Sequence, residues 1–140
     1  MAIVEIKKQD LFDPSNPIIG HGVNIKGYMG AGIALVFKKL YPKNFMEYKE
    51  LCKIDRLNPG DVFSFNENGR VILNIASQDF PGPFARLEWI ESALQKVFEL
   101  GYEEIALPWI GCGIGSLKRE DVLEILKASP LKKITICEVD

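Results

Sequence analysis

The chain has 140 residues, of which 47% are hydrophobic and 26% are charged, and its formal net charge at pH 7 is -2. This length suits one domain with its own core, and the charge disfavours strong nucleic-acid binding through a basic face. The three cysteines are too few and too scattered for a disulfide framework or a zinc site. The N-terminus leads straight into a strand pattern and no long apolar run follows, so we expect a cytoplasmic protein that contacts no membrane.

Apolar runs and helical spacings alternate along the chain. In chain order we expect strands at Ile3–Ile6 and Ile18–Asn24, helices at Ile33–Leu40 and Asn44–Lys53, strands at Asp61–Phe65 and Arg70–Ile75, a helix on Leu87, Ile90, Leu94 and Val97, a strand at Glu104–Ile110, a helix around Val122, Ile125 and Leu126, and a strand at Lys133–Glu138. Such alternation predicts a layered α/β domain.

Local signals mark the ends of several elements. Pro42 interrupts the first helix, and Asn44 with Glu47 is expected to cap the second. Asn66–Gly69 predicts a hairpin turn, and Gly101 predicts the end of the third helix.

Two glycine-rich loops carry the functional signal. Gly27–Gly32 leaves a strand and opens a helix, and Gly111–Ser116 does the same later in the chain. Glycines let a ligand approach the backbone, and a helix start offers unpaired N–H groups that suit a phosphate. The spacing matches neither a Walker nor a Rossmann motif. Tight helix–strand packing is the alternative for each loop alone, but the pair together favours one ligand held from both sides at the carboxyl edge of a sheet.

These residues resemble those of a macrodomain. The matching segments are Lys8–Phe12, Val23–Asn24, Met29–Ala34, Phe37–Lys38, Asn74–Gln78, Leu107–Pro108 and Ile110–Gly115. The resemblance spans nearly the whole chain and is nearest to the compact branch that includes ADP-ribose-1″-phosphate phosphatases and ADP-ribosyl hydrolases. It implies one macrodomain over residues 1–140, with a three-layer α/β/α fold around a mixed sheet of about six strands. It also implies ADP-ribose or a derivative as the partner, with neither a cofactor nor a metal, and we expect a monomer.

The resemblance assigns ligand contacts residue by residue. Asp10 would accept a hydrogen bond from the adenine amino group beside the Leu11 amide, and Asn24 would face the distal ribose. The remaining expected contacts to the diphosphate and distal ribose are Gly30, Gly32, Ile33, Gly111, Cys112, Gly113, Ile114, Gly115 and Ser116. For Asp10 and Asn24 the alternative is an ordinary turn residue.

The chemistry is less clearly marked than the binding. Family members that remove ADP-ribose from glutamate or DNA use a lysine where this chain has Ser77–Asp79, so lysine-based covalent chemistry is not expected. His21, the one histidine, is a candidate acid–base group together with Asn24 and Asp79, although strand alternation puts His21 and Asn24 on opposite faces. The alternative for His21 is burial in the strand. For Asp79 the alternative is a role in the loop, and for Cys112 it is packing.

The sequence therefore predicts ADP-ribose binding, and the leading activity is release of phosphate from ADP-ribose-1″-phosphate. Removal of an acetyl or ADP-ribosyl group from the same ribose is a close variant. A module that only recognises ADP-ribose is the alternative of a different class.

Overall fold

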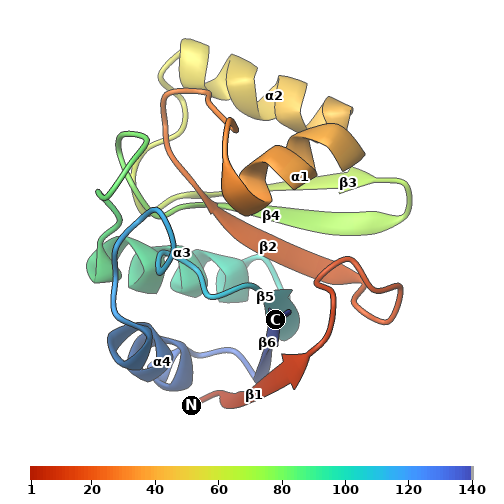
Figure 1. The fold of residues 1–140 in the computed structure, drawn as a ribbon, viewed down its shortest axis with the longest axis vertical. Helices are drawn as coiled ribbons and strands as arrows, with labels where there is room; N and C mark the ends of the chain where they lie inside the picture. The colour runs from red at the N-terminus through yellow and green to blue at the C-terminus, as the bar shows by residue number, and fades with distance from the viewer. Residues whose placement is uncertain (140) are drawn as a thin grey trace.

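The computed structural model describes residues 1–139, which form three layers with a six-stranded sheet in the middle. The strands are β1 (Ile3–Lys8), β2 (Ile18–Val23), β3 (Val62–Glu67), β4 (Arg70–Ala76), β5 (Glu104–Leu107) and β6 (Lys133–Glu138). The helices are α1 (Gly32–Leu40), α2 (Pro42–Lys53), α3 (Leu87–Glu99) and α4 (Arg119–Ala128). Helices α1 and α2 cover one face of the sheet, and α3 and α4 cover the other (Figure 1). The predicted three-layer fold is confirmed.

The sheet is mixed, as predicted. Its order is β1-β6-β5-β2-β4-β3, and each neighbouring pair is parallel except β3 with β4. Because both faces are covered by helices, the central strands read as continuous apolar runs, and β4 is buried from Ile72 to Ala76. The hairpin between β3 and β4 turns at Asn68 and Gly69, whose φ angles of 53° and 76° are those of a tight primed turn.

One apolar cluster fills the space on each side of the sheet. Under α3 and α4, the positions Ile90, Ala93, Leu94 and Val97 recur at helical spacing and are fully buried. Under α1 and α2, the second cluster contains Phe37 and Tyr48, which are also fully buried. Gly101, with φ 94°, follows α3 as the sequence indicated.

The predicted start of α2 is wrong. The helix begins at Pro42, a residue suited to the first turn because its missing N–H has no partner there. Asn44 lies inside the helix and is fully buried. The carboxylate of Glu67, at the end of β3, accepts hydrogen bonds from the backbone N–H groups of Asn44 at 2.7 Å and Lys43 at 3.4 Å. A residue distant in sequence therefore supplies the cap, which local patterns could not reveal.

The strand at the second glycine loop is also shorter than predicted. β5 ends at Leu107, and the segment from Pro108 to Ile110 already belongs to the loop. Pro108 has no backbone N–H to continue the ladder. The chain therefore leaves the sheet three residues earlier than predicted, and Pro108, Trp109 and Ile110 line the cavity between the loops.

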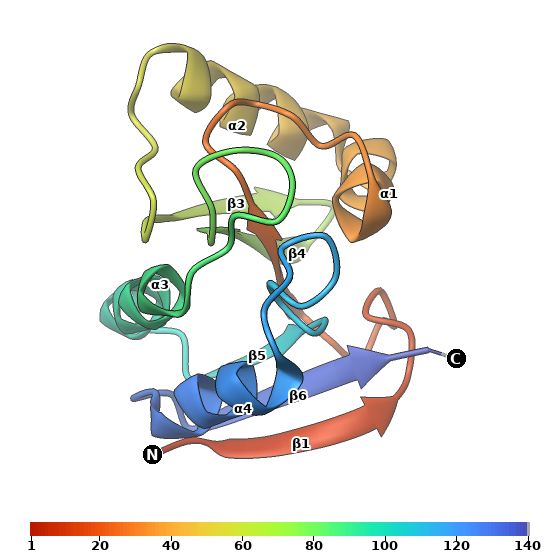
Figure 2. The same ribbon diagram turned by 60° about the vertical axis from the view of Figure 1, so that its left-hand side comes forward.

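The carboxyl ends of the three central strands all lead into loops on one side of the molecule. These loops follow β2 (residues 24–31), β4 (residues 77–86) and β5 (residues 108–118). They come together between the α1–α2 layer and the α3–α4 layer (Figure 2). This is where open α/β sheets usually bind ligands.

We expect Glu67→Ala to lower the free energy of unfolding by about 1–3 kcal/mol, since two N–H groups at the start of α2 lose a buried, charged acceptor. Chemical denaturation of both proteins measures the difference. Glu67→Gln keeps one oxygen acceptor and is expected to lose less. Equal stability of Glu67→Ala and wild type would show that α2 needs no cap from β3.

Candidate functional site

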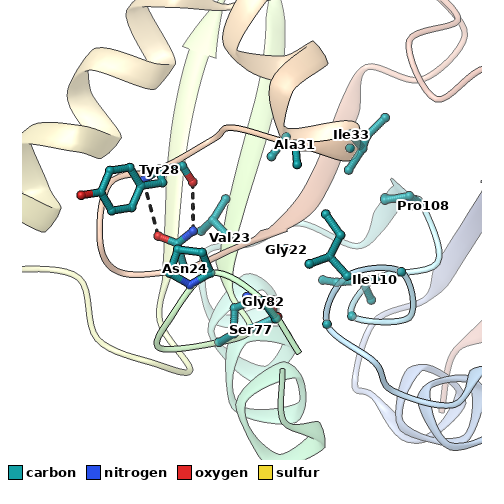
Figure 3. Close-up of a pocket in the computed structure, with 18 of the residues that line it drawn as sticks. Gly22, Val23, Asn24, Tyr28, Ala31, Ile33, Ser77, Gly82, Pro108 and Ile110 are labelled. Atoms are coloured by element: carbon teal, nitrogen blue, oxygen red, sulfur yellow. Dashed lines mark hydrogen bonds between the residues drawn. The ribbon is translucent and has the colours of Figure 1, made fainter. Parts of the chain in front are cut away.

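A cavity of about 560 Å³ lies among the three loops that follow β2, β4 and β5. Its lining is Gly22, Val23, Asn24, Tyr28, Gly30, Ala31, Gly32, Ile33, Ala34, Ser77, Gln78, Pro81, Gly82, Pro108, Trp109, Ile110, Gly111, Gly113, Ile114 and Gly115. Figure 3 shows Ala31 and Ile33 along one edge, Asn24, Ser77 and Gly82 on a second side, and Pro108 and Ile110 on a third. Both predicted glycine loops therefore border one cavity.

Within residues 1–139, no residue that lines the cavity carries a charged side chain. The wall instead includes the start of α1, where Gly32, Ile33 and Ala34 form the first turn. Ala31 provides no side-chain cap, and no acidic residue lies in that turn. The first N–H groups of a helix have no partner within it and carry partial positive charge. This edge of the cavity can therefore bind an anion through the backbone.

The glycines at the cavity divide into two groups. A Cβ at Gly30 or Gly113 would meet no heavy atom within 4 Å, and one at Gly32 would meet only Ile114 Cδ1, at 3.7 Å. A Cβ at Gly111 would lie 2.8 Å from Leu117 Cδ1. At Gly115 it would lie 2.7 Å from both Ala85 Cβ and the Gly111 carbonyl oxygen. Gly30, Gly32 and Gly113 therefore leave space at the cavity, whereas Gly111 and Gly115 permit close packing of the loop against its neighbours.

The 3.7 Å from the Cβ position of Gly32 to Ile114 Cδ1 also shows how closely the two loops approach each other. Gly32 opens α1 with φ 58°, in the left-handed region that favours glycine. Ile114 belongs to the other loop and is 55% exposed. The two loops thus close toward each other across the cavity, as the sequence predicted for a ligand held from both sides.

Asn24 lines the cavity, and its side-chain amide shapes the first loop. Its Nδ2 donates to the Tyr28 carbonyl at 2.9 Å, and its Oδ1 accepts from Lys26 N at 2.9 Å (Figure 3 shows its bonds to Tyr28). The buried Tyr48 hydroxyl donates toward the Asn24 carbonyl at 2.7 Å and toward Oδ1 at 3.0 Å. Burial raises the pKa of Tyr48, so this hydroxyl stays protonated. Asn24 therefore holds the loop in place, and its contact with the distal ribose stays a prediction.

His21 is not among the residues that line the cavity, so its position fits the alternative of burial in the strand, and a catalytic role stays a prediction. The side chain is fully buried and stacks on Phe37 with a centroid separation of 3.7 Å. Its Nε2 lies 2.9 Å from Asn74 Oδ1. Because Asn74 Nδ2 donates to the Phe63 carbonyl, Asn74 Oδ1 is the acceptor and His21 Nε2 carries the proton. Burial lowers the pKa of His21 to about 4, although the bond to Asn74 opposes this shift.

Two other candidates for chemistry have local structural partners. Asp79 Oδ1 accepts from the Phe80 N–H at 2.9 Å, and Asp79 does not line the cavity. Cys112 packs at the edge of the apolar cluster under α3 and α4, and burial raises the pKa of its thiol. A raised pKa disfavours the thiolate that a nucleophile requires. The structure therefore fits the alternatives in which Asp79 serves only the loop and Cys112 only packs against the core.

Four predicted ligand contacts lie outside the cavity lining. Asp10 is exposed, and its Oδ1 accepts from the Phe12 N–H at 3.0 Å in a local turn. Leu11 is buried in the cluster under α1 and α2. Ser116 is exposed with φ 68°, and Cys112 packs inward. The structure fits the alternative in which Asp10 is an ordinary turn residue. Contact of Asp10 and Leu11 with adenine stays a prediction.

The structure also brings in residues that sequence patterns did not assign to the site. Gln78 Nε2 donates to the carbonyls of Phe80 at 2.6 Å and Gly82 at 3.0 Å, which folds the loop after β4 against the cavity. Trp109 forms part of the wall, and its Nε1 donates to Glu138 Oε2 at 2.6 Å. Ser77 lies at the end of the buried β4 run. Its position at the carboxyl end of a central strand is the signal that could have identified it.

Within residues 1–139, no helix is long and apolar enough to cross a membrane. Over the same residues, no group of three potential metal ligands comes together.

The buried His21 makes stability depend on pH. Its pKa is lower in the folded protein than the ordinary value of 6.5, so its contribution is complete above about pH 6.5 and is lost as the pH falls toward 4. We expect the free energy of unfolding to fall by about 2–3 kcal/mol over that window relative to a His21→Gln variant. Denaturation curves from pH 7 to 4 measure this. Parallel pH profiles for the two proteins would contradict the burial of a neutral imidazole.

Comparisons with known proteins agree with this geometry. The Macro domain model matches residues 21–126. A curated DNA ADP-ribosyl glycohydrolase from Mycobacterium tuberculosis is 31% identical over 121 residues, covering 81% of this chain and 34% of the relative. An ADP-ribose 1″-phosphate phosphatase from Meyerozyma guilliermondii is 40% identical over 58 residues, covering 39% of this chain and 33% of that protein.

Among solved structures, the macrodomain of Mycobacterium tuberculosis DarG superposes with a TM-score of 0.83 at 25% identity, and 99% of each chain is covered. The chain spans about a third of the length of the first curated relatives, which are DNA ADP-ribosyl glycohydrolases. The family model covers most of this sequence, and the solved macrodomain shares its fold throughout. The chain belongs to the Macro domain family.

Proposed function

We propose that this chain binds ADP-ribose or a derivative in the cavity and hydrolyses a group from the distal ribose, with the phosphate of ADP-ribose-1″-phosphate as the first candidate. The observation that carries the proposal is the anion site built from backbone. The uncapped first turn of α1 and the open positions Gly30, Gly32 and Gly113 border one uncharged cavity. A diphosphate needs N–H donors and close backbone approach, which this wall offers.

The curated relatives support the same class of ligand. Their names describe removal of ADP-ribose from DNA or of phosphate from ADP-ribose 1″-phosphate. The phosphatase is the better guide to the reaction because this chain lacks the lysine expected for covalent ADP-ribosyl chemistry. The stretch Ser77–Asp79 contains no lysine, and the Gln78 side-chain amide donates to two carbonyls. Acetyl or ADP-ribosyl groups on the same ribose remain substrate candidates that the test below separates.

A second candidate function is recognition of ADP-ribose without catalysis. Among the residues of the described chain that line the cavity, none is Asp, Glu, His, Lys or Cys. Apart from the Tyr28 hydroxyl, the described lining residues offer none of the groups that usually provide general acid–base assistance, which is worth about 10²–10⁴ in rate. Turnover would depend on a positioned water and on the phosphate of the substrate itself, which predicts a slow enzyme.

The test measures binding and turnover on the same preparation. We expect calorimetry to show micromolar ADP-ribose affinity, about -8 kcal/mol, and weaker binding of AMP. Incubation with ADP-ribose-1″-phosphate is expected to release phosphate. Binding without turnover on this substrate, on acetylated ADP-ribose or on ADP-ribosylated DNA would assign the chain to the recognition class. Absence of binding at millimolar ADP-ribose would reject the proposal altogether.

Gly30→Glu tests the diphosphate position. Gly30 is preferable to Gly32 because its φ lies outside the left-handed region and a side chain there meets open space. We expect the carboxylate to weaken ADP-ribose binding at least 100-fold with little change in thermal stability. Gly30→Gln is the size-matched control and is expected to bind about tenfold better than Gly30→Glu, with the gap narrowing in high salt. Equal affinities for Glu and Gln would place the diphosphate elsewhere.

A further inference from the structure

The loop after β4 begins with a buried hydroxyl that has no partner. Ser77 is 1% exposed, and its Oγ makes no hydrogen bond with any part of the chain that the structure describes. A buried hydroxyl without a partner costs stability, and native proteins rarely keep one without a reason. Ser77 also lines the cavity.

The neighbouring strand leaves room for this hydroxyl. A Cβ at Gly22 would lie only 2.5 Å from Ser77 Oγ and 3.2 Å from Ile110 Cγ1. Gly22 is therefore the residue type that permits a polar group at this corner, between the carboxyl ends of β2 and β4. Gly22, Ser77 and Ile110 all contribute to the cavity wall.

The strand order indicates which end of the ligand this corner serves. The two glycine loops follow β2 and β5, near the middle of the order β1-β6-β5-β2-β4-β3. If Asp10, after β1, marks the adenine end, then β4 lies on the opposite side of the diphosphate. Ser77 follows β4, on the same side of the cavity as Asn24 and Gly82 (Figure 3).

We propose that Ser77 is a ligand-binding residue whose hydroxyl hydrogen-bonds a hydroxyl group of the distal ribose. The inference rests on the proposed ADP-ribose binding. Rotation about χ1 can turn Oγ from Gly22 toward the cavity, because serine has three staggered positions. The ligand then supplies the partner that the folded chain does not. The amide of the neighbouring Asn24 bonds to the first loop, and no hydrogen bond joins it to Ser77 Oγ.

This role predicts an unusual pairing of effects in Ser77→Ala. Removing a buried hydroxyl that has no partner is expected to leave the melting temperature of the ligand-free protein unchanged or higher. The same variant is expected to bind ADP-ribose about three- to tenfold more weakly, while its affinity for ADP, which lacks the distal ribose, changes less than twofold. Calorimetry with both ligands and thermal unfolding without ligand measure the two effects.

Ser129→Ala is the matched control. Ser129 is also buried, at 6% exposure, but its Oγ donates to the Leu126 carbonyl at 2.8 Å, and it does not line the cavity. That variant is expected to melt at a lower temperature and to bind both ligands like wild type.

The alternative outcomes are distinct. If wild type binds ADP-ribose and Ser77→Ala binds it equally well, Ser77 is not a ligand group. Equal losses for ADP and ADP-ribose would overturn the ribose assignment, and a lowered melting temperature in Ser77→Ala would show a structural role. Failure of wild type to bind ADP-ribose would reject the proposed function itself, and this inference with it.

Discussion

A chain of buried polar side chains under α1 and α2 determines where the first glycine loop can lie. His21 on β2 donates to Asn74 on β4, Asn44 on α2 exchanges two hydrogen bonds with Asn74, and Glu67 on β3 caps α2. Each group is buried, so each pairing fails if its element shifts by one residue. These hydrogen-bonded side chains thereby fix α2 on the sheet. Tyr48 of the same helix then reaches Asn24 and the loop beyond it.

This constraint explains which parts of the molecule the sequence could predict. Strands and helices with strong periodicity, such as α3 and β4, are set by local pattern and by burial on both faces of the sheet. The hairpin at Asn68 and Gly69 follows from turn chemistry. The start of α2 could not be predicted from local sequence, because its cap comes from Glu67, more than twenty residues away. Local rules favoured Asn44, a common capping residue that tertiary packing places inside the helix instead.

The candidate site also has parts that the sequence predicted and parts that it did not. Glycine spacing predicted both loops, since open backbone at a helix start is a local property. The roles of individual side chains depended on orientation, which a one-residue change along a strand reverses. His21 faces the α1–α2 layer and stacks on Phe37, while its neighbour Gly22 faces the cavity. His21, a polar residue beside the first glycine loop, therefore stabilises the fold. Ser77, which belongs to no distinctive motif, lines the cavity.

A cavity without charged side chains has a physical consequence for catalysis. Backbone N–H groups do not titrate, so under the proposed function they would hold the diphosphate, away from the bond that breaks, without transferring a proton. Binding that is equal in ground and transition states lowers KM without raising kcat. Under the proposed function we expect rate enhancement to come from positioning, with a water held in line with the bond to be broken. Such positioning requires the distal ribose to be fixed, and the proposal gives this task to the neutral hydroxyl and amide side chains at the β2–β4 corner.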